Sequence, residues 1–547
     1  MWLSAALMLS LSGCDFLNLD ENQYTVVCRN GHFVGKAESE TGVVAFKGIP
    51  YAKAPVKELR WKDPQPADAS DEVKKAYKFG KSSVQYELYS EPLKTSVGED
   101  CLTLNIWTSD LSVPSKPVMV FFHGGSYVWG GTSEPIYSGQ YIVSAHPDVI
   151  VVTCNYRLGL LGFNNLDGIP GGENYPHVQN LGVLDAMMSL QWVKENIAAF
   201  GGDPDNVTIF GESAGGGMVS ALLNTDAAGS LFRRAIIQSG AANILFAKSD
   251  PMDIRQQGIN ALMQVTGCST AQELASLSEK QWIKAIGTEF DEDWNTPSDF
   301  MQLPSCGAYP LHDDPYESLR SGSAGGVDIL IGTNLDELNY WADEFGEKPL
   351  MEMNAAERQE AISIFTDWYI PENYSSLLSS ITESERSCVA QYLSLYSDME
   401  DYLAKSRLLG DVFYRQPSIK MAELHADAGA GKTYMYLFEK KNTNLDILGA
   451  GHSMELPYVF LNPNEQVTYG KVDMDFAHSI CDAWVSFART GNPSTASAAW
   501  PEYDGQDRKT MVFGNDCTLK VVSDPYSTER KLLQFTRNYN LRQSAGS

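Results

Sequence analysis

The sequence predicts an α/β fold with a mostly parallel central sheet flanked by helices, and three observations support this prediction. Short, nearly continuous apolar runs recur along the chain, as in strands that are buried on both faces of a parallel sheet. A helical pattern separates two of these runs, which is the strand–helix–strand order of a doubly wound domain. The composition, with 43% hydrophobic and 11% aromatic residues, is sufficient for a sizeable core.

Five apolar runs are predicted to be strands of this sheet. They are PVMVFFHGG (117–125), VIVVTCNYR (149–157), VTIFGES (207–213), RAIIQSG (234–240) and VDILIGTN (327–334). Between the second and third runs, residues 181–201 predict a helix, because Leu181, Leu184, Met188 and Trp192 recur at helical spacing before the stop signal of Gly201. Residues 345–430 are rich in helical patterns and lack strong strands, so we expect them to decorate the sheet.

The N-terminal residues predict export and a lipid anchor. Residues 2–11 form an apolar run that is too short to span a bilayer but suits the core of a signal peptide. The run ends in LSGC (11–14), which resembles the bacterial lipobox, although no Lys or Arg precedes it. We therefore expect residues 1–14 to be a lipoprotein-type signal peptide ending at the lipidated Cys14, and residues 15–24 to be a polar tether. The expected location is a membrane surface of the cell envelope or periplasm, or otherwise the secreted fraction.

No internal repeat or low-complexity tract divides the rest of the chain, and we predict one domain over residues 25–540. The chain has 41 basic and 69 acidic residues, a formal charge of −28, which disfavours nucleic acid as a partner. Eight cysteines follow Cys14, and this even number permits disulfides in an exported chain without defining their pairing. Their spacing includes no C-x-x-C pair and no Cys/His cluster, so no metal site is predicted.

The stretch GESAG (211–215) predicts a nucleophilic serine. Residues 207–210 read as a strand and residues 218–223 as the buried face of a helix, which places Ser213 on the turn between them. A G-x-S-x-G motif in this context is typical of a nucleophile elbow, where a strained turn raises the serine Oγ above the sheet. The glycines allow the strand and the helix to approach each other without a Cβ clash.

A nucleophilic serine needs a base, and in folds with this elbow the base is a histidine that follows the serine and the acid in the chain. Four histidines follow Ser213. His425 and His478 lie in helical patterns and His312 lies in a polar loop, where a structural role is favoured. His452 lies in a glycine-bounded loop after an apolar segment, and we predict that it is the base.

Candidates for the acid and for the oxyanion donors lie at the ends of two predicted strands. Asp336 and Glu337 follow the strand at 327–334, and the residues alone leave both open as the acid. The stretch FFHGGSYVWGG (121–131) leaves a buried strand and turns on glycines, which frees backbone N–H groups to face a ligand. Its position before the elbow is typical of an HGG-type oxyanion loop.

These residues belong to a longer set of motifs that resembles the type-B carboxylesterases, the family of bacterial para-nitrobenzyl-type esterases, animal carboxylesterases and cholinesterases. The matching stretches are FKGIPYAKAP (46–55), EDCLTLNIW (99–107), HGGSY (123–127), NYRLGLLGF (155–163), AAFGGDPDNVTIFGESAGG (198–216), LFRRAIIQSG (231–240), GTNLDE (332–337) and GHSMELPYVF (451–460). They occur in family order over nearly the whole chain. The resemblance implies an α/β-hydrolase fold.

The resemblance also implies roles for individual residues. Ser213 matches the nucleophile, Glu337 the acid and His452 the base of a catalytic triad. The oxyanion hole that it implies consists of the backbone N–H groups of Gly125, Ser126 and Ala214. Ser126 replaces a glycine that is common in the family, which should matter little because the donor is its N–H group.

Four further positions carry supporting roles by the same resemblance. Glu212 and Ser239 match residues that lie close to the base and support it. Arg60 and Glu99 match an ion pair that braces the loop beside the active site.

Two departures from the family occur in this loop, residues 82–100. The expected disulfide partner of Cys101 falls near position 83, which is Ser83, so that disulfide is absent or rewired. The loop also contains no tryptophan, the residue with which cholinesterases hold a quaternary ammonium group, so choline esters are not expected substrates.

The resemblance therefore implies a serine carboxylesterase that hydrolyses small carboxylic esters through an acyl-enzyme, without a metal or organic cofactor. Two alternatives are a lipase that acts on lipid esters and a non-catalytic binding protein on the same fold. The binding proteins of the family lack at least one triad residue, whereas all three are present here, which favours an enzyme. The patterns leave the natural substrate, the acyl length and the oligomeric state open.

Overall fold

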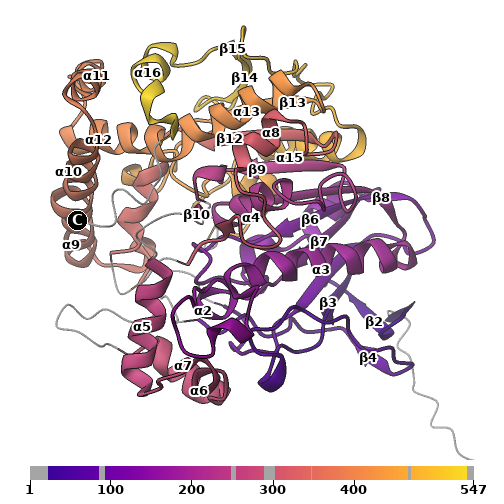
Figure 1. Ribbon diagram of the computed structural model, residues 1–547. Coiled ribbons are helices and arrows are strands. Elements are labelled where there is room, and N and C mark those ends of the chain that lie inside the picture. Colours follow the sequence, from indigo (N-terminus) through magenta and orange to yellow (C-terminus); the bar gives the residue numbers. More distant parts are fainter. Residues whose placement is uncertain are drawn as a thin grey trace, which may run out of the picture.

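The structure is a computed structural model that describes residues 23–85, 93–244, 246–247, 254–288, 302–345, 348–465 and 470–538. Within these residues, thirteen strands form one mixed sheet in the order β1-β2-β3-β5-β7-β6-β8-β9-β12-β13-β14-β15, with β4 paired to β2 (Figure 1). The signal peptide, Cys14 and nearly all of the predicted tether lie outside the described residues.

The centre of the sheet is parallel and contains every strand predicted from the apolar runs. These strands are β6 (Lys116–Phe122), β7 (Ile150–Cys154), β8 (Gly202–Glu212), β9 (Arg234–Gln238) and β12 (Asp328–Asn334). They are consecutive neighbours in the order β7-β6-β8-β9-β12, and β13 (Thr433–Phe438) and β14 (Lys509–Phe513) extend the parallel part. The predicted fold class is confirmed.

The outer strands are antiparallel and were not predicted from the sequence. They are β1 (Gln23–Cys28), β2 (Gly31–Ala37), β3 (Val44–Pro50) and β5 (Thr103–Thr108) at one end, and β15 (Leu519–Ser523) at the other. The short strand β4 (Val73–Lys75) runs parallel to β2. Their sequences lack the long apolar runs of the centre because most of these strands are solvent-exposed on at least one side.

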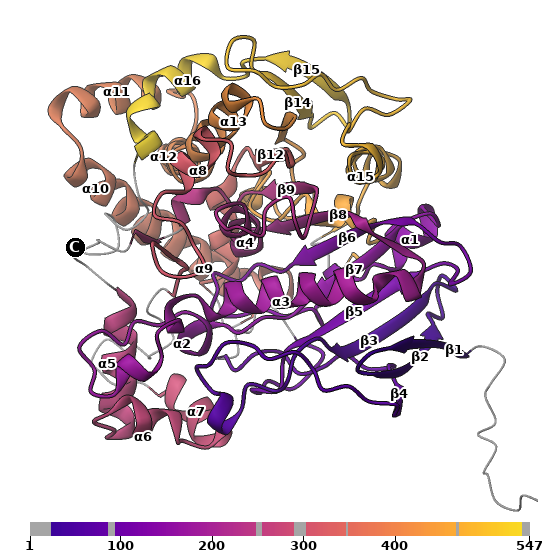
Figure 2. The same ribbon diagram turned by 45° about the vertical axis from the view of Figure 1, so that its right-hand side comes forward.

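Alternate residues of the central strands enter two different cores. In β6, Val118, Val120 and Phe122 pack in one core, whereas Met119 and Phe121 pack in the other. The first core is covered by α3 (Leu181–Asn196) and α4 (Ala214–Leu223), and the second by α1 (Gln140–Ala145) and α15 (Met474–Thr490), on opposite sides of the sheet (Figure 2). This burial on both faces explains why the runs are continuously apolar.

The predicted helix over 181–201 is present as α3 followed by a 3₁₀ turn (Ile197–Phe200), and Gly201 ends it in the left-handed conformation. The remaining short elements surround the central layers. They are α2 (Gly159–Gly162), α5 (Ile254–Thr266), α6 (Ala271–Ala275), α7 (Glu279–Ile286), α8 (Pro315–Arg320), α14 (Leu456–Val459), α16 (Ser527–Leu532) and the pair β10 (Phe246–Ala247) and β11 (Ser305–Cys306).

The region 345–430 is helical and lies beside the sheet, as expected (Figures 1 and 2). Its helices are α9 (Ala355–Ile364), α10 (Ile370–Ser380), α11 (Glu383–Ser394), α12 (Asp401–Gly410) and α13 (Gln416–Ala428). Single π-helical turns, Phe365–Tyr369 and Asp411–Arg415, connect α9 to α10 and α12 to α13. π turns of this kind occur often at functional sites, and the second one carries Tyr414, which contacts the site described below.

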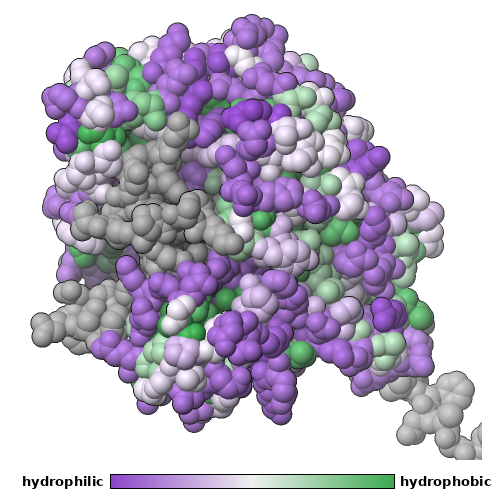
Figure 3. Space-filling model, in the orientation of Figure 1, coloured by the Kyte–Doolittle hydropathy of each residue, from purple (hydrophilic) through white to green (hydrophobic). Residues whose placement is uncertain are grey.

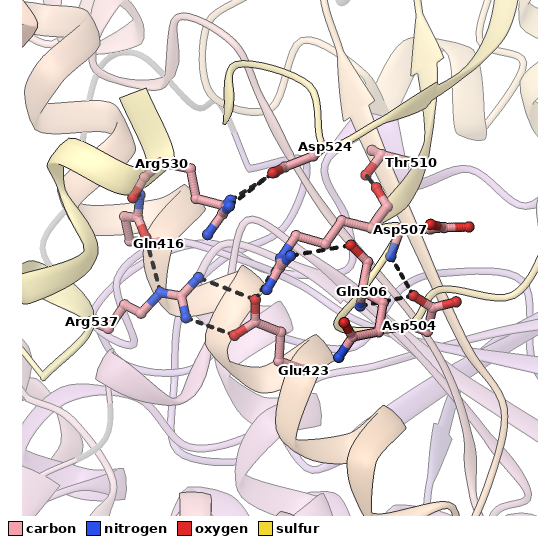
Figure 4. Close-up of polar contacts among 10 residues, drawn as sticks. Gln416, Glu423, Asp504, Gln506, Asp507, Thr510, Asp524, Arg530 and Arg537 are labelled. Carbon is pink, nitrogen blue, oxygen red and sulfur yellow. Dashed lines mark hydrogen bonds and ion pairs between the residues drawn. The ribbon is translucent and has the colours of Figure 1, made fainter. Parts of the chain in front are cut away.

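Ion pairs hold the C-terminal segment against α13 (Figure 4). Glu423 of α13 accepts hydrogen bonds from Nε of Arg508 at 2.8 Å and from Nη1 of Arg537 at 2.6 Å. Arg530 of α16 pairs with Asp524, with 2.7 Å between Nε and Oδ1. The two charge-assisted contacts of Glu423 join segments that are 85 and 114 residues apart in the sequence, whereas Arg530 and Asp524 are near neighbours in the chain.

All eight cysteines from Cys28 to Cys517 lie within the described residues and are free thiols. Cys101 is thus unpaired, and no disulfide joins any of the cysteines in this part of the chain. Of the described helices, none has the length and apolar character needed to cross a membrane.

Candidate active site

Ser213 lies on a strained turn between β8 and α4. Its φ and ψ are 57° and −124°, and its N–H donates to the carbonyl oxygen of Gln238 at 2.9 Å. The flanking glycines are required by close approach, because a Cβ at Gly211 would lie 2.4 Å from Gly215. A Cβ at Gly215 would lie 2.0 Å from the carbonyl oxygen of Phe122. The turn therefore has the geometry of a nucleophile elbow.

Ser213 and His452 line the same cavity, which encloses about 620 Å³ including its open mouth. The wall is completed by Gly124, Gly125, Ser126, Trp129, Tyr137, Glu212, Tyr340, Trp341, Glu344 and Ser453. Its aromatic side chains offer apolar surface next to the serine hydroxyl, so the cavity suits a small organic molecule with an apolar part.

His452 contacts Glu337 through one ring nitrogen. Nδ1 of His452 lies 2.6 Å from Oε2 of Glu337, and both side chains are almost completely buried. The other carboxylate oxygen, Oε1, accepts hydrogen bonds from Oγ of Ser239 at 2.6 Å and from the N–H of Asn334 at 2.7 Å. Ser239 thus contacts the carboxylate rather than the imidazole, and Glu337 is held in one orientation by three partners.

Asp336 points in a different direction. Its Oδ2 accepts a hydrogen bond from the N–H of Ala450 at 3.0 Å, and its Oδ1 lies 3.5 Å from Arg407. Asp336 therefore fixes the loop that precedes His452 without contacting the imidazole. Both neighbouring carboxylates were candidates for the acid, but the chain after β12 directs only Glu337 to His452.

Two more carboxylates are buried near His452. Oε1 of Glu212 lies 3.2 Å from Nε2 of His452 and accepts a hydrogen bond from Oγ of Ser453 at 2.7 Å. Glu455 accepts hydrogen bonds from Gln238 at 2.8 Å and from Asn334 at 2.6 Å. Nε2 of His452 makes no hydrogen bond within the described part of the chain, so it is available to a group in the cavity.

Burial and nearby negative charge shift the pKa of His452 in opposite directions. Burial lowers the pKa of an imidazole, but the charges of Glu212 and Glu337 and the hydrogen bond to Glu337 outweigh it and raise the pKa of His452 to about 9. Burial also raises the pKa of Glu212, although the positive charge of His452 opposes this shift. The imidazole therefore binds a proton more tightly than an exposed histidine does.

The loop after β6 offers backbone donors to the cavity. Gly125 and Ser126 have positive φ angles of 94° and 50°, and a Cβ at Gly125 would lie 2.2 Å from the carbonyl oxygen of Trp129. The carbonyl oxygen of Gly125 accepts hydrogen bonds from the N–H groups of Val128 and Trp129 at 2.9 and 3.0 Å. Because a trans peptide points its C=O and N–H in opposite directions, these bonds direct the N–H of Ser126 the other way.

The N–H groups of Gly125 and Ser126 find no acceptor among the described residues. Ala214 is the first residue of α4, where the N–H groups have no carbonyl partner within the helix. Gly125 and Ser126 line the cavity, as does Ser213, which Ala214 directly follows.

Gln85, from the loop of residues 82–100, binds the loop after β6 that carries these backbone donors. Its amide makes two hydrogen bonds to the backbone of Gly130, from Nε2 to the carbonyl oxygen at 2.9 Å and from the N–H of Gly130 to Oε1 at 2.8 Å. Nε2 also donates to the carbonyl oxygen of Ser83 at 3.0 Å. Gln85 thereby joins the loop that carries the backbone donors to its neighbour.

The neighbouring loop is fixed by the predicted ion pair. Arg60 binds both carboxylate oxygens of Glu99 at 2.6 Å, and both side chains are 3% exposed. Ser83, at the position of the missing disulfide partner, is buried and accepts a hydrogen bond from the N–H of Leu158 at 3.1 Å. A hydrogen bond at Ser83 and an ion pair at Glu99 thus hold the two described parts of this loop.

The other three candidate histidines lie outside the cavity lining. His425 of α13 is buried, with Nδ1 2.7 Å from Oγ1 of Thr433, and His478 lies on α15. His312 pairs with Asp226 at 3.1 Å near the surface. Of the residues that the structure describes, no group of His, Cys, Asp and Glu forms a potential metal site.

Sequence reasoning missed several residues of the site. Glu455 lies within the quoted motif GHSMELPYVF, three residues after His452, and a charged residue in an apolar motif is a signal that could have identified it. Gln85 gave no such signal, because its contacts depend on a loop 45 residues later. The rings of Trp341 and Tyr414, with centroids 5.2 and 4.9 Å from that of His452, were also missed.

Comparisons with known proteins agree with this architecture. The model of the carboxylesterase family matches residues 22–532. The chain is 33% identical to the para-nitrobenzyl esterase of Bacillus subtilis (strain 168), over 91% of this chain and 96% of that protein. It is 30% identical to a cholinesterase of Mus musculus, over 91% and 84% of the two chains.

Solved structures of esterases have the same fold. A structure of a para-nitrobenzyl esterase superimposes with a TM-score of 0.75 at 31% identity, covering 93% of this chain and 99% of that chain. A carboxylesterase of Geobacillus stearothermophilus superimposes with a TM-score of 0.73 at 32% identity and the same coverage. The fold, the elbow and these relatives define a carboxylic ester hydrolase of the α/β-hydrolase type. The chain belongs to the carboxylesterase family.

Proposed function

We propose that this carboxylesterase hydrolyses small carboxylic esters by an acyl-enzyme mechanism with Ser213 as nucleophile, His452 as base and Glu337 as the acid that orients the base. The observation that carries the proposal is the convergence of the strained elbow, the buried His452–Glu337 contact and the unpaired backbone N–H groups on one cavity. Ser213 attacks the ester carbonyl while Nε2 of His452 takes its proton and returns it to the leaving alkoxide. Water releases the acyl group by the reverse path.

The N–H groups of Gly125, Ser126 and Ala214 receive the negative charge that develops on the carbonyl oxygen. The carboxylate of Glu337 stabilises the imidazolium and keeps the proton of the neutral ring on Nδ1, which leaves Nε2 unprotonated. Glu212 adds a second negative charge near Nε2, and Ser239 holds Glu337. Each of these tasks needs only groups of this chain.

An ester panel graded by acyl length, with Ser213→Ala as the blank, tests the substrate class against the alternative of a lipase. A carboxylesterase reaches its full rate on dissolved short-chain esters, in keeping with a cavity whose walls beside Ser213 carry aromatic side chains. A rate that rises only when a long-chain ester aggregates would instead assign the chain to the lipases. Because residues 82–100 contain no tryptophan, we expect neutral esters to be better substrates than choline esters.

Glu212→Gln is expected to move the acid limb of the kcat/KM profile to lower pH. The base must be neutral, so kcat/KM rises as pH passes upward through the pKa of His452, and the wild-type limb should lie above about 6.5, the ordinary histidine value. Removing the charge of Glu212 lowers that pKa by about 1 unit or more. The pH profile of a soluble ester measures the shift.

Glu212→Asp is the matched control, because it keeps the charge and should leave the limb closer to that of the wild type. An identical acid limb in the wild type and in Glu212→Gln would contradict the role of Glu212 in raising the pKa of His452.

Gln85→Glu is expected to lower kcat about tenfold with a smaller change in KM. The carboxylate cannot donate to the carbonyl oxygens of Gly130 and Ser83, so the oxyanion loop loses its lateral support and the donor geometry loosens. The effect should be smaller than the 10²–10³-fold loss typical of removing a whole donor. Weaker binding of a trifluoromethyl ketone, which mimics the tetrahedral intermediate, is the second readout.

Gln391→Glu, a change of the same type on the exposed face of α11, is the control and should leave both readouts unaltered. Unchanged kcat and unchanged ketone affinity in Gln85→Glu would show that the loop keeps its geometry without Gln85.

We further propose that the chain is an exported lipoprotein anchored through Cys14. The supporting observation is the apolar run that ends in the LSGC motif. Full-length protein expressed in a bacterium is expected to enter the detergent phase and to incorporate labelled fatty acid, because two acyl chains give stable anchoring where one is marginal. Cys14→Ala should do neither. A soluble wild-type protein cleaved at another position would rule out the lipobox.

A further inference from the structure

We propose that the outer face of β1, β2 and β4 is a docking surface for an anionic lipid membrane. This surface, called the β1–β2–β4 face below, consists of the exposed Val27, Lys36, Val73 and Lys75 and the half-buried His32. The geometry of docking rests on the proposed lipid anchor, whereas binding of the face to lipid can be tested without it.

Strand register places these residues on one side of the sheet. Val27 is the Cα partner of His32, and His32 is the partner of Val73, so the three form one row across the strands. Val34 and Lys75 are paired one step further along, on the same side, because side chains alternate with a period of two. The residues between them, Val26, Cys28 and Phe33, point to the opposite side and are buried in the core.

Two of the three valines on this side of the sheet are exposed, whereas Val34 is buried. Val27 and Val73 have 62% and 54% of their surface accessible, the largest fractions of any valine in the described chain. Figure 3 shows a mostly hydrophilic surface, with hydrophobic residues at the right-hand edge of the molecule, where Figure 1 places β2 and β4. Because both side chains are solvent-accessible, Val27 and Val73 can enter the boundary between lipid headgroups and acyl chains.

The charge of the face is opposite to that of the protein. Its side chains include Lys36 and Lys75, and none of the three strands contains an acidic residue, in a chain with 69 Asp and Glu. Lys36 and Lys75 are exposed, and neither forms an ion pair with a described residue. More widely, residues 23–85 hold eleven Lys or Arg and seven Asp or Glu, a charge of +4 in a chain whose total is −28.

This asymmetry favours an anionic membrane over a second copy of the chain. A symmetric pair of these faces would bring the same lysines together, whereas lipid phosphates offer acceptors to all of them. The acidic remainder of the protein weakens the attraction little, because charges more than about 8 Å from the lipid are screened at physiological salt.

The position of the proposed lipid anchor also favours a membrane as the binding partner of the β1–β2–β4 face. Eight residues separate Cys14 from Gln23, the first residue of β1, and they reach about 30 Å at full extension. A chain held at Cys14 therefore keeps β1 near the lipid. The carboxyl ends of the parallel strands, where Ser213 lies, point away from β1, β2 and β4 (Figure 2), so docking by this face leaves the cavity open to dissolved esters.

Vesicle sedimentation tests the inference with a chain that starts at position 14 and carries Cys14→Ser, so that no acyl chain contributes. We expect this acidic protein to bind phosphatidylglycerol vesicles at low salt, to bind phosphatidylcholine vesicles weakly, and to be released by high salt. Lys36→Glu with Lys75→Glu should lower the bound fraction about tenfold or more. Val27→Ser with Val73→Ser should lower it as well.

Lys280→Glu with Lys284→Glu is the matched control, because both lysines are exposed on α7, far from β1. All variants should keep wild-type hydrolysis of a soluble ester, which shows that they are folded. Equal binding to the two kinds of vesicle, or equal binding by wild type and the Lys36/Lys75 variant, would overturn the inference, as would an equal loss in the control pair. The lipid-anchor proposal is tested separately, by fatty acid incorporation at Cys14, and its failure would not affect this vesicle experiment.

Discussion

Ser213→Ala is expected to lower kcat/KM for ester hydrolysis by about 10⁴-fold or more while the protein stays folded, since the proposed nucleophile is lost and only the oxyanion donors and binding remain. A fluorophosphonate probe should label the wild type at one site and abolish its activity, and it should not label the variant. The measurements are steady-state kinetics, the mass of the labelled protein and thermal unfolding.

Ser126→Ala is the control for this experiment. Ser126 lines the same cavity, but its proposed contribution is the backbone N–H, which alanine retains, so activity and labelling should persist. Labelling of Ser213→Ala at the wild-type level would remove Ser213 from the mechanism. Loss of labelling in Ser126→Ala would show that the hydroxyl of Ser126 takes part.

Glu337→Gln is expected to lower kcat about 10²–10⁴-fold, by analogy with acid-to-amide changes in other triads. The structure gives a reason that concerns the imidazole tautomer. Oε1 of Glu337 accepts from Oγ of Ser239 and from the backbone N–H of Asn334, which can only donate. The oxygen of the glutamine amide must therefore take this side, and its NH₂ group faces Nδ1 of His452. The ring proton is then driven to Nε2, where it blocks proton transfer from Ser213.

Asp336→Asn is the matched control at the neighbouring position. The asparagine oxygen still accepts from the N–H of Ala450, while the ion pair with Arg407 is lost. We expect a small change in kcat and a lower unfolding temperature, with a stability loss of about 1–3 kcal/mol. If Asp336→Asn lowers kcat more than Glu337→Gln in well-folded protein, the two assignments must be exchanged.

Much of the fold follows from local patterns. The five apolar runs form adjacent parallel strands, and they could be predicted because strands buried on both faces contain few polar residues. The outer strands were not predicted because they lack such continuous apolar runs. β1 alternates between the buried Val26 and the exposed Val27, and a short alternating stretch near the N-terminus is a weaker signal than a continuous run.

The site was predictable where its geometry is local. Ser213 is defined by a strand, two glycines and a helix within a few residues, and His452 by a glycine-bounded loop. The contacts of Glu455 and Gln85 were not predictable, because each joins segments that are distant in the chain. Glu455 receives hydrogen bonds from β9 and from the end of β12, and Gln85 binds Gly130 across two loops.

The sequence by itself determined the order of strands and helices around Ser213, the identity of the residue types that could serve it, and the family to which they belong. Only the tertiary structure decided which of Asp336 and Glu337 contacts His452, how many carboxylates surround the imidazole, and that Val27 and Val73 form one exposed row with Lys36 and Lys75 nearby. The physical reason is that periodicity records whether a position is buried. The direction of a side chain after a strand ends, and its partner across the chain, depend on how distant segments pack together.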